Sequence, residues 1–190
     1  KLINEFAEQG QNIILIGVHY NNWEMTAQRM PLVFMHEVFA IYKPLTNKFF
    51  DSKMKLSREK FGLKMISMKE TKSYFNNKTN IPRAIIFGSD QSPSNSKKAY
   101  WSKFLNQDSA FLYGAEKYAK SFNWPVIYVS INKIKRGYYS VDYKLITQKP
   151  KEEPHGKIIE KFALLLESDI KNNPEYWLWT HNRWKKKIYE

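Results

Sequence analysis

Residues Ile13-Ile14-Leu15-Ile16-Gly17-Val18-His19 form an unbroken apolar stretch that runs directly into a histidine. A short apolar run of this length is typical of a strand buried on both faces, as strands of parallel sheets are. Asn22 is a good capping residue, and a helix from Trp23 to Met30 is expected after it. The stretch therefore predicts a strand–turn–helix unit. His19 would lie at the carboxyl end of the strand, where ligand sites of α/β proteins usually form.

The rest of the chain continues this alternation of apolar strands and helices. Further strands are expected at 38–42, 64–67 and 83–87, and helices at 45–61, 69–77, 111–121 and 155–172. Residues 126–131 and 138–146, separated by a turn at Gly137, indicate an antiparallel hairpin. A short aromatic and basic helix is expected after Pro174. The pattern predicts an α/β fold: a mostly parallel central sheet flanked by helices, with a C-terminal hairpin and aromatic, basic terminal helices.

Composition narrows the classes of protein that the chain can represent. It has 190 residues, of which 43% are hydrophobic, and we expect one domain over residues 1–190. The absence of cysteine excludes disulfides, zinc–thiolate sites and a cysteine nucleophile. A net charge of +13 with 16% aromatic residues favours a polyanionic partner, either single-stranded nucleic acid or an anionic membrane surface. No apolar run is long enough to span a bilayer.

The segment from His19 to Glu24 is the strongest candidate for chemistry. An offset of five residues on a continuous helix leaves two side chains about 140° apart, so they meet only if the chain turns between them. Asn21 and Asn22 favour such a turn. The imidazole could then take a proton from a substrate hydroxyl while the carboxylate stabilises the imidazolium. The alternative is a strand-end histidine that is paired with solvent.

His19-Tyr20-Asn21-Asn22-Trp23-Glu24 resembles the H-x-x-x-x-D/E box of the lysophospholipid acyltransferase superfamily. It is most similar to the H-x-G-N-W-E form of the bacterial lipid A biosynthesis (lauroyl/myristoyl) acyltransferases, with Asn21 in place of the glycine. Further matches follow in the order of that family: Tyr42-Lys43-Pro44, Arg58 before Phe61-Gly62, Asp90-Gln91 before Pro93, and Pro174-Glu175-Tyr176-Trp177. The E-G-T-R phosphate box of glycerolipid acyltransferases is absent, which argues against a glycerol-3-phosphate acceptor.

The resemblance implies transfer of a fatty acyl group from an acyl-carrier-protein thioester to a hydroxyl of a lipid A precursor, without a metal or a bound cofactor. It implies that His19 is the general base, assisted by Glu24. Contacts with substrate are implied for five further residues: Asn22, Lys43, Arg58, Asp90 and Gln91. Without the resemblance, the basic residues of this set are ordinary solvated charges, and Asp90-Gln91 is an ordinary loop turn.

The C-terminal tail is the second functional feature that the sequence suggests. We expect it to lie on anionic lipid through Trp177, Trp179, Trp184, Lys185, Lys186 and Lys187. The alternative is a packed terminal segment with solvated lysines, and we favour a mixture of the two in which Trp177 or Trp179 is packed and the lysines face lipid phosphates. The resemblance implies an enzyme at the cytoplasmic face of the bacterial inner membrane. Because the chain begins at Lys1, we expect that an N-terminal membrane-anchoring segment is missing from it.

Two other functions were compared with this one. The first is an acyltransferase of the same fold that uses another glycolipid or an aminolipid as acceptor. The second is a non-enzymatic basic module that binds nucleic acid. The second accounts for charge and aromatic content but not for His19, Glu24 and Asp90 near strand ends, and no nucleic-acid-binding motif is present. We therefore expect no nucleic acid partner.

Overall fold

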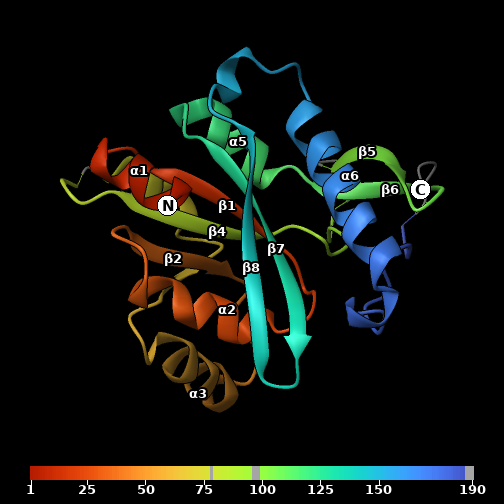
Figure 1. Ribbon diagram of the computed structural model, residues 1–190, viewed down its shortest axis with the longest axis horizontal. Helices are drawn as coiled ribbons and strands as arrows, with labels where there is room; N and C mark the ends of the chain where they lie inside the picture. The colour runs from red at the N-terminus through yellow and green to blue at the C-terminus, as the bar shows by residue number, and fades with distance from the viewer. Residues whose placement is uncertain (78, 96–98, 187–190) are drawn as a thin grey trace.

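The computed structural model describes residues 1–77, 79–95 and 99–186. Its centre is a six-stranded sheet in the order β3-β2-β4-β1-β7-β8 (Figure 1). The strands are β1 (Ile13–Gly17), β2 (Glu37–Tyr42), β3 (Lys64–Ser67), β4 (Arg83–Gly88), β7 (Val126–Lys135) and β8 (Tyr138–Thr147). Neighbouring strands from β3 to β7 are parallel, and β8 is antiparallel to β7. The predicted fold class and the predicted hairpin are confirmed.

Strand β1 lies in the middle of the sheet and supplies side chains to both of its faces. Ile13 and Leu15 pack with Ile3 and Phe6 of helix α1 (Leu2–Glu8). Ile14 and Ile16 belong to the opposite cluster, together with residues of α5 (Gly114–Phe122) and α6 (Lys157–Asn172). Successive side chains of a strand point to opposite faces. An unbroken apolar run is therefore what a strand covered on both faces requires.

Three further α-helices of the described chain follow β1, β2 and β3 in turn. They are α2 (Trp23–Arg29), α3 (Lys48–Glu59) and α4 (Thr71–Asn76). Asn47 begins α3 by accepting hydrogen bonds from the backbone amides of Phe49 and Phe50. Within the described part of the chain, every helix is too short or too polar to cross a bilayer.

A second, two-stranded sheet was not predicted from the sequence. It consists of β5 (Ala99–Phe104) and β6 (Gln107–Leu112), which pair antiparallel. The predicted helix at 111–121 therefore begins only at Gly114. The two turn residues, Leu105 and Asn106, have φ values of 49° and 63°. Tight hairpin turns need positive φ at both central positions, which leucine rarely adopts, so the turn has a weak sequence signal.

The predicted tail helix after Pro174 is wrong. Residues Pro174–Tyr176 form one 3-10 turn, Trp177 is extended, and turns follow at 179–180 and 183–184. Trp177 forms an isolated antiparallel bridge with Tyr20, and the Leu178 amide donates to the carbonyl of His19 over 3.1 Å. The Asn21 amide donates in turn to the carbonyl of Tyr176 over 2.8 Å. The tail pairs with the loop after β1 in place of forming its own helical hydrogen bonds.

Candidate active site

Two neighbouring strand ends build the site. Strands β1 and β4 are paired in parallel, with Gly17 opposite Gly88. The loops that follow them therefore leave the sheet side by side, and they carry His19 and Asp90. A Cβ atom at Gly88 would lie 3.5 Å from Cε1 of His19, an ordinary contact distance, so the imidazole lies directly against the end of β4. Strand order thus brings together two residues that are 71 positions apart in the sequence.

The His19 ring is hydrogen-bonded to Asp90. Its Nδ1 lies 2.8 Å from one carboxylate oxygen of Asp90, and the backbone amide of His19 donates to the other oxygen over 3.1 Å. The Trp177 indole N–H donates to that second oxygen, also over 3.1 Å. Asp90 is only 2% exposed. The carboxylate is thus enclosed by donors on both of its oxygens.

The ionisation of Asp90 follows from these contacts. Burial by itself would raise the pKa of its carboxyl. The hydrogen bond from the His19 ring, the charge of that ring and the donors from the His19 backbone and Trp177 outweigh burial and bring the Asp90 pKa below its ordinary value. An ionised Asp90 can only accept, so Nδ1 of His19 carries a proton, and in the neutral ring the free lone pair is on Nε2. This is the tautomer that a general base needs.

Glu24 has a different partner from the one predicted. It accepts two hydrogen bonds from Arg58 of α3, one from Nη2 over 2.5 Å and one from Nε over 3.0 Å. The turn after His19 brings the ring of Trp23 against the imidazole, with 5.4 Å between ring centroids. The predicted hydrogen bond between Glu24 and His19 is therefore wrong. Nδ1 of His19 is bonded to Asp90, and both carboxylate oxygens of Glu24 accept from the guanidinium of Arg58.

A cavity of about 560 Å³ opens beside His19. Its lining combines apolar with basic side chains, among them Ile41, Met54, Met68, Phe87, Tyr118, Lys43, Lys55 and Arg58. A smaller cavity of about 130 Å³ lies next to it, and its lining is largely apolar. His19 and Arg58 line both cavities, whereas Glu24 lines only the smaller one. His19 therefore lies where a mixed apolar and basic cavity meets an apolar one.

The other predicted substrate contacts lie in different places. Lys43 and Gln91 line the larger cavity together with Arg58. Asn22 accepts a hydrogen bond from the Met25 amide over 3.2 Å and caps α2, and it also lines a separate surface groove. Asp90 is buried behind His19 and does not line either cavity. The prediction that Asp90 contacts the acceptor is therefore wrong, and Asp90 contacts His19 instead.

The tail residues predicted to lie on a membrane are largely packed against the protein. Trp177 is 5% exposed, and the Trp184 indole donates to Ser109 Oγ over 2.8 Å while its ring stacks on Phe104. Trp179 is half exposed, Lys185 lines the larger cavity and Lys186 is partly exposed. Lys187 lies outside the described residues. For Trp177, burial corrects the predicted membrane contact, whereas for the partly buried Trp184 the contact stays a prediction.

Two roles in the site were missed from the sequence. Asp90 was predicted as a substrate contact, not as the partner of His19, and Trp177 was not predicted to bind Asp90. The tail makes one more contact, in which the Ser92 amide donates to Nε2 of His181 over 3.0 Å. A signal for Asp90 was present, because it follows an apolar strand as His19 does. Using that signal requires knowing that the two strands are neighbours.

Comparison with known proteins gives the family. A search of curated proteins found no match. The family model described as bacterial lipid A biosynthesis acyltransferase matches residues 1–186, which is nearly the whole chain. The match spans the His19–Asp90 pair, both cavities and the tail that closes on them. This chain therefore belongs to the bacterial lipid A biosynthesis acyltransferases, a family of acyl-transferring enzymes.

Proposed function

We propose that this enzyme transfers a fatty acyl group from an acyl-carrier-protein thioester to a hydroxyl of a lipid A precursor, with His19 as the general base. The observation that carries the proposal is the hydrogen bond between His19 Nδ1 and the buried carboxylate of Asp90, beside a cavity with apolar and basic walls. Asp90 holds the ring in one tautomer and stabilises the imidazolium that forms during the reaction.

His19 carries the proton between the two stages of the proposed acyl transfer. Nε2 takes the proton of the acceptor hydroxyl as its oxygen attacks the thioester carbonyl carbon. The tetrahedral intermediate collapses, the carbon–sulfur bond breaks and the ester remains on the acceptor. The departing thiolate then takes the proton from Nε2, which returns the imidazole to its starting form. The step consumes no oxidant, and the one transferred proton passes from the acceptor hydroxyl through Nε2 to the departing thiol.

We assign Glu24 and Arg58 to the cavity wall as a unit. Glu24 holds the guanidinium of Arg58 through two hydrogen bonds, and Arg58 lines both cavities beside His19. A fixed positive charge at this place is suited to the negative charge that develops on the thioester oxygen, or to a phosphate of the acceptor. Glu24 thus acts as a positioning residue that assists His19 through Arg58.

The walls of the larger cavity fit the proposed substrates. Apolar side chains such as Met54, Met68 and Phe87 suit a fatty acyl chain, and Lys43, Lys55 and Arg58 suit a phosphorylated acceptor. The net charge of +13 would steer an acidic carrier protein towards the enzyme. We place the enzyme at the cytoplasmic face of the inner membrane, where such substrates meet. The alternative acceptor is another glycolipid or an aminolipid.

His19→Ala tests the proposal. Acyl carrier protein carrying a fatty acid and a detergent-dispersed lipid A precursor are supplied, and the product is identified by mass spectrometry. The variant should be about 10²–10⁴-fold slower because the general base is lost. His155→Ala is the matched control, since His155 bonds Tyr113 and neither residue lines either cavity. Full activity of His19→Ala would overturn the mechanism, and product formed only with a different lipid would establish the alternative acceptor.

Glu24→Gln tests the role of the Arg58 pair. The amide keeps the shape of Glu24 but loses its charge, so Arg58 is held less firmly, and we expect roughly a tenfold lower kcat. Glu37→Gln is the control, because Glu37 forms an ion pair with Lys64 elsewhere on the sheet. Equal kcat values for the two variants would show that the Glu24–Arg58 pair does not assist the reaction.

A further inference from the structure

Helix α3 presents three large apolar side chains to solvent, whereas its polar residues Arg58 and Glu59 contact the body of the protein. All of α3 is described, and none of its residues is buried. Phe49, Phe50 and Leu56 are 62%, 59% and 65% exposed. Arg58 faces inward and binds Glu24, and Glu59 accepts from the Met65 amide over 3.1 Å. This arrangement is the reverse of an ordinary surface helix, whose apolar stripe faces the core.

Lysines lie within the same exposed stripe. Phe49, Lys53, Leu56 and Lys60 recur at intervals of four, three and four residues, which places them on one side of the helical path. The ammonium of Lys53 lies 5.5 Å from the ring centroid of Phe49, and that of Lys60 lies 5.4 Å from the ring centroid of Phe61. The acidic groups of α3 are engaged towards the protein: besides Glu59, Asp51 accepts from the Leu45 amide. The outer face of α3 is thus apolar and cationic.

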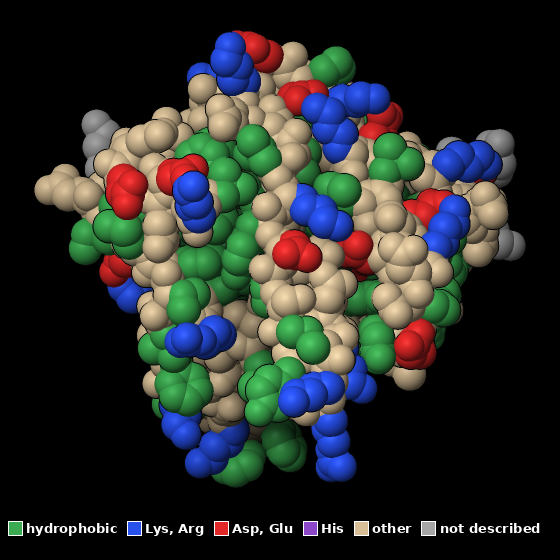
Figure 2. Space-filling view, viewed as in Figure 1, with side chains coloured by type: hydrophobic (Ala, Val, Ile, Leu, Met, Phe, Trp, Pro, Cys, Tyr) green, Lys and Arg blue, Asp and Glu red, His purple; other side chains and the backbone are tan. Residues whose placement is uncertain are grey.

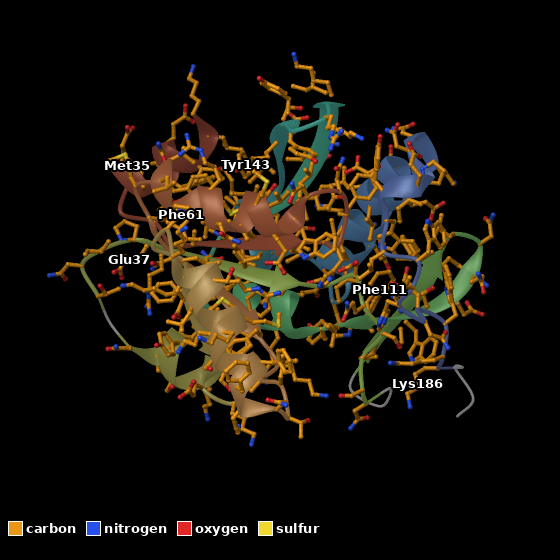
Figure 3. All side chains as sticks on the ribbon, turned by 90° about the horizontal axis from the view of Figure 1, so that it is seen from below. Met35, Glu37, Phe61, Phe111, Tyr143 and Lys186 are labelled. Carbon is orange, nitrogen blue, oxygen red and sulfur yellow. The ribbon has the colours of Figure 1, made fainter. Side chains whose placement is uncertain are left out.

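The same combination continues across one side of the molecule. At the lower edge in Figure 2, where α3 and the tip of the β7–β8 hairpin lie, hydrophobic and Lys or Arg side chains gather, and no Asp or Glu is seen there in this view. Figure 3, seen from below, shows α3, α2 and the hairpin across this side. At the hairpin tip Ile134 and Tyr138 are 69% and 60% exposed, and Lys135 lies 4.4 Å from the Tyr138 ring centroid. On α2, Met25 is 58% exposed.

We propose that the outer face of α3, formed by Phe49, Phe50, Lys53, Leu56 and Lys60, docks on an anionic lipid bilayer. Exposed aromatic and aliphatic side chains enter the headgroup boundary of a bilayer, and lysines beside them bind lipid phosphates. An acidic protein would satisfy the lysines, whereas a lipid surface satisfies the lysines and the exposed apolar side chains together. Charge complementarity and the breadth of this side both favour a bilayer as the partner.

The position of α3 gives the docking a consequence for the reaction. Met54 and Lys55 of the same helix line the larger cavity beside His19. A docked α3 would therefore hold the wall of that cavity at the lipid interface, and a lipid acceptor could reach His19 without leaving the bilayer surface. The inference rests on the proposed function for this consequence, but the docking itself is measured without any substrate.

A single labelled cysteine tests the docking directly. The chain has no cysteine, so Leu56→Cys and Leu164→Cys each give one labelling site for an environment-sensitive fluorophore. Leu164 on α6 is the matched control, because it is 70% exposed. With phosphatidylcholine vesicles that contain phosphatidylglycerol, the label at position 56 should shift to shorter wavelength and the label at 164 should not. Equal responses at both positions would overturn the proposal.

Co-sedimentation with the same vesicles measures the two parts of the surface separately. Lys53→Ala/Lys60→Ala should lower binding roughly 30-fold, because each lysine near an anionic surface contributes to partition. Phe49→Ser/Leu56→Ser should lower it at least about tenfold. The controls Lys117→Ala/Lys151→Ala and Leu145→Ser/Leu164→Ser should bind as the unmodified protein does. Equal losses in the variants and their controls would contradict a docking surface on α3.

The other possible occupants of this face give different results. A response of the label at 56 to acidic acyl carrier protein but not to vesicles would overturn the proposal in favour of a carrier-docking surface. A response that rises with protein concentration in the absence of vesicles would overturn it in favour of a second copy. Transfer to a detergent-dispersed acceptor separates the two proposals, since docking variants should retain it and His19→Ala should lose it. If the docking variants also lost this transfer, the outer face of α3 would be needed for the reaction itself, which would contradict a role confined to membrane docking.

Discussion

The residues around His19 form a chain of hydrogen bonds that begins in the tail. The Trp177 indole donates to Asp90, and Asp90 accepts from the ring and backbone of His19. Each contact restricts the next, because a carboxylate with both oxygens engaged cannot rotate away from the imidazole. Strand β1 brings His19 to the carboxyl end of the sheet, and Trp177 of the tail holds the Asp90 carboxylate in place beside it. Preorganisation of the proposed base therefore depends on segments far apart in the sequence.

Trp177→Phe should expose this dependence. Phenylalanine keeps an aromatic ring in the buried site but removes the donor to Asp90, so the Asp90 pKa should rise towards its ordinary value and kcat should fall roughly tenfold. A group with a depressed folded pKa adds stability above its unfolded pKa, and this stability is lost as the pH falls through the folded pKa. In Trp177→Phe, that loss should begin at a higher pH.

Carboxyl NMR titration of Asp90, with thermal unfolding at decreasing pH, measures both effects. Trp179→Phe is the matched control, because the Trp179 indole donates to the Pro174 carbonyl and its ring is half exposed. An unchanged Asp90 titration in Trp177→Phe would mean that Trp177 only fills space.

At the scale of elements, local sequence signals account for the helices and strands of the main sheet. The apolar runs at 13–18, 38–42, 64–67 and 83–87 correspond to β1 to β4, and the periodic apolar positions of 155–172 correspond to α6. The β5–β6 hairpin and the non-helical tail do not follow from such signals. The hairpin turns at a leucine with positive φ, and the tail obtains its hydrogen bonds from the loop after β1. In both places tertiary contacts decide the local conformation.

Helix α5 ends at a residue whose conformation is itself testable. Asn123 follows the helix with φ 56° and ψ 42°, and its amide donates to the carbonyl of Ala119. Asparagine and glycine tolerate this left-handed conformation, whereas a Cβ without a polar group makes it costly. Asn123→Ala should lower the free energy of unfolding by about 1 kcal/mol, and Asn123→Gly should leave it unchanged or raise it. Urea unfolding measures both, and equal destabilisation by the two substitutions would contradict the explanation.

At the scale of the whole molecule, the sequence predicts the layers of the fold better than it predicts which residues meet. Periodicity identifies strands, but strand order is set by packing, and only strand order places Asp90 beside His19 and directs Glu24 to Arg58. The net charge of +13 predicts an anionic partner but not its location. The tail, rich in Trp and Lys, is the candidate that the sequence suggests, yet Trp177 is buried against Asp90 and Trp184 stacks on Phe104, and the exposed apolar and basic face lies on α3.

The most direct test of the account is a double-mutant cycle between His19 and Asp90, measured as acyl transfer from the carrier protein to the lipid A precursor. Asp90→Asn removes the charge that supports the imidazolium and should slow the reaction by about 10²–10⁴. Residues that act as one unit are strongly non-additive, so His19→Ala/Asp90→Asn should be no slower than His19→Ala within about threefold. If Asp90→Asn slowed the reaction equally with and without His19, the two residues would act independently, and the central claim of a His19–Asp90 catalytic pair would be contradicted.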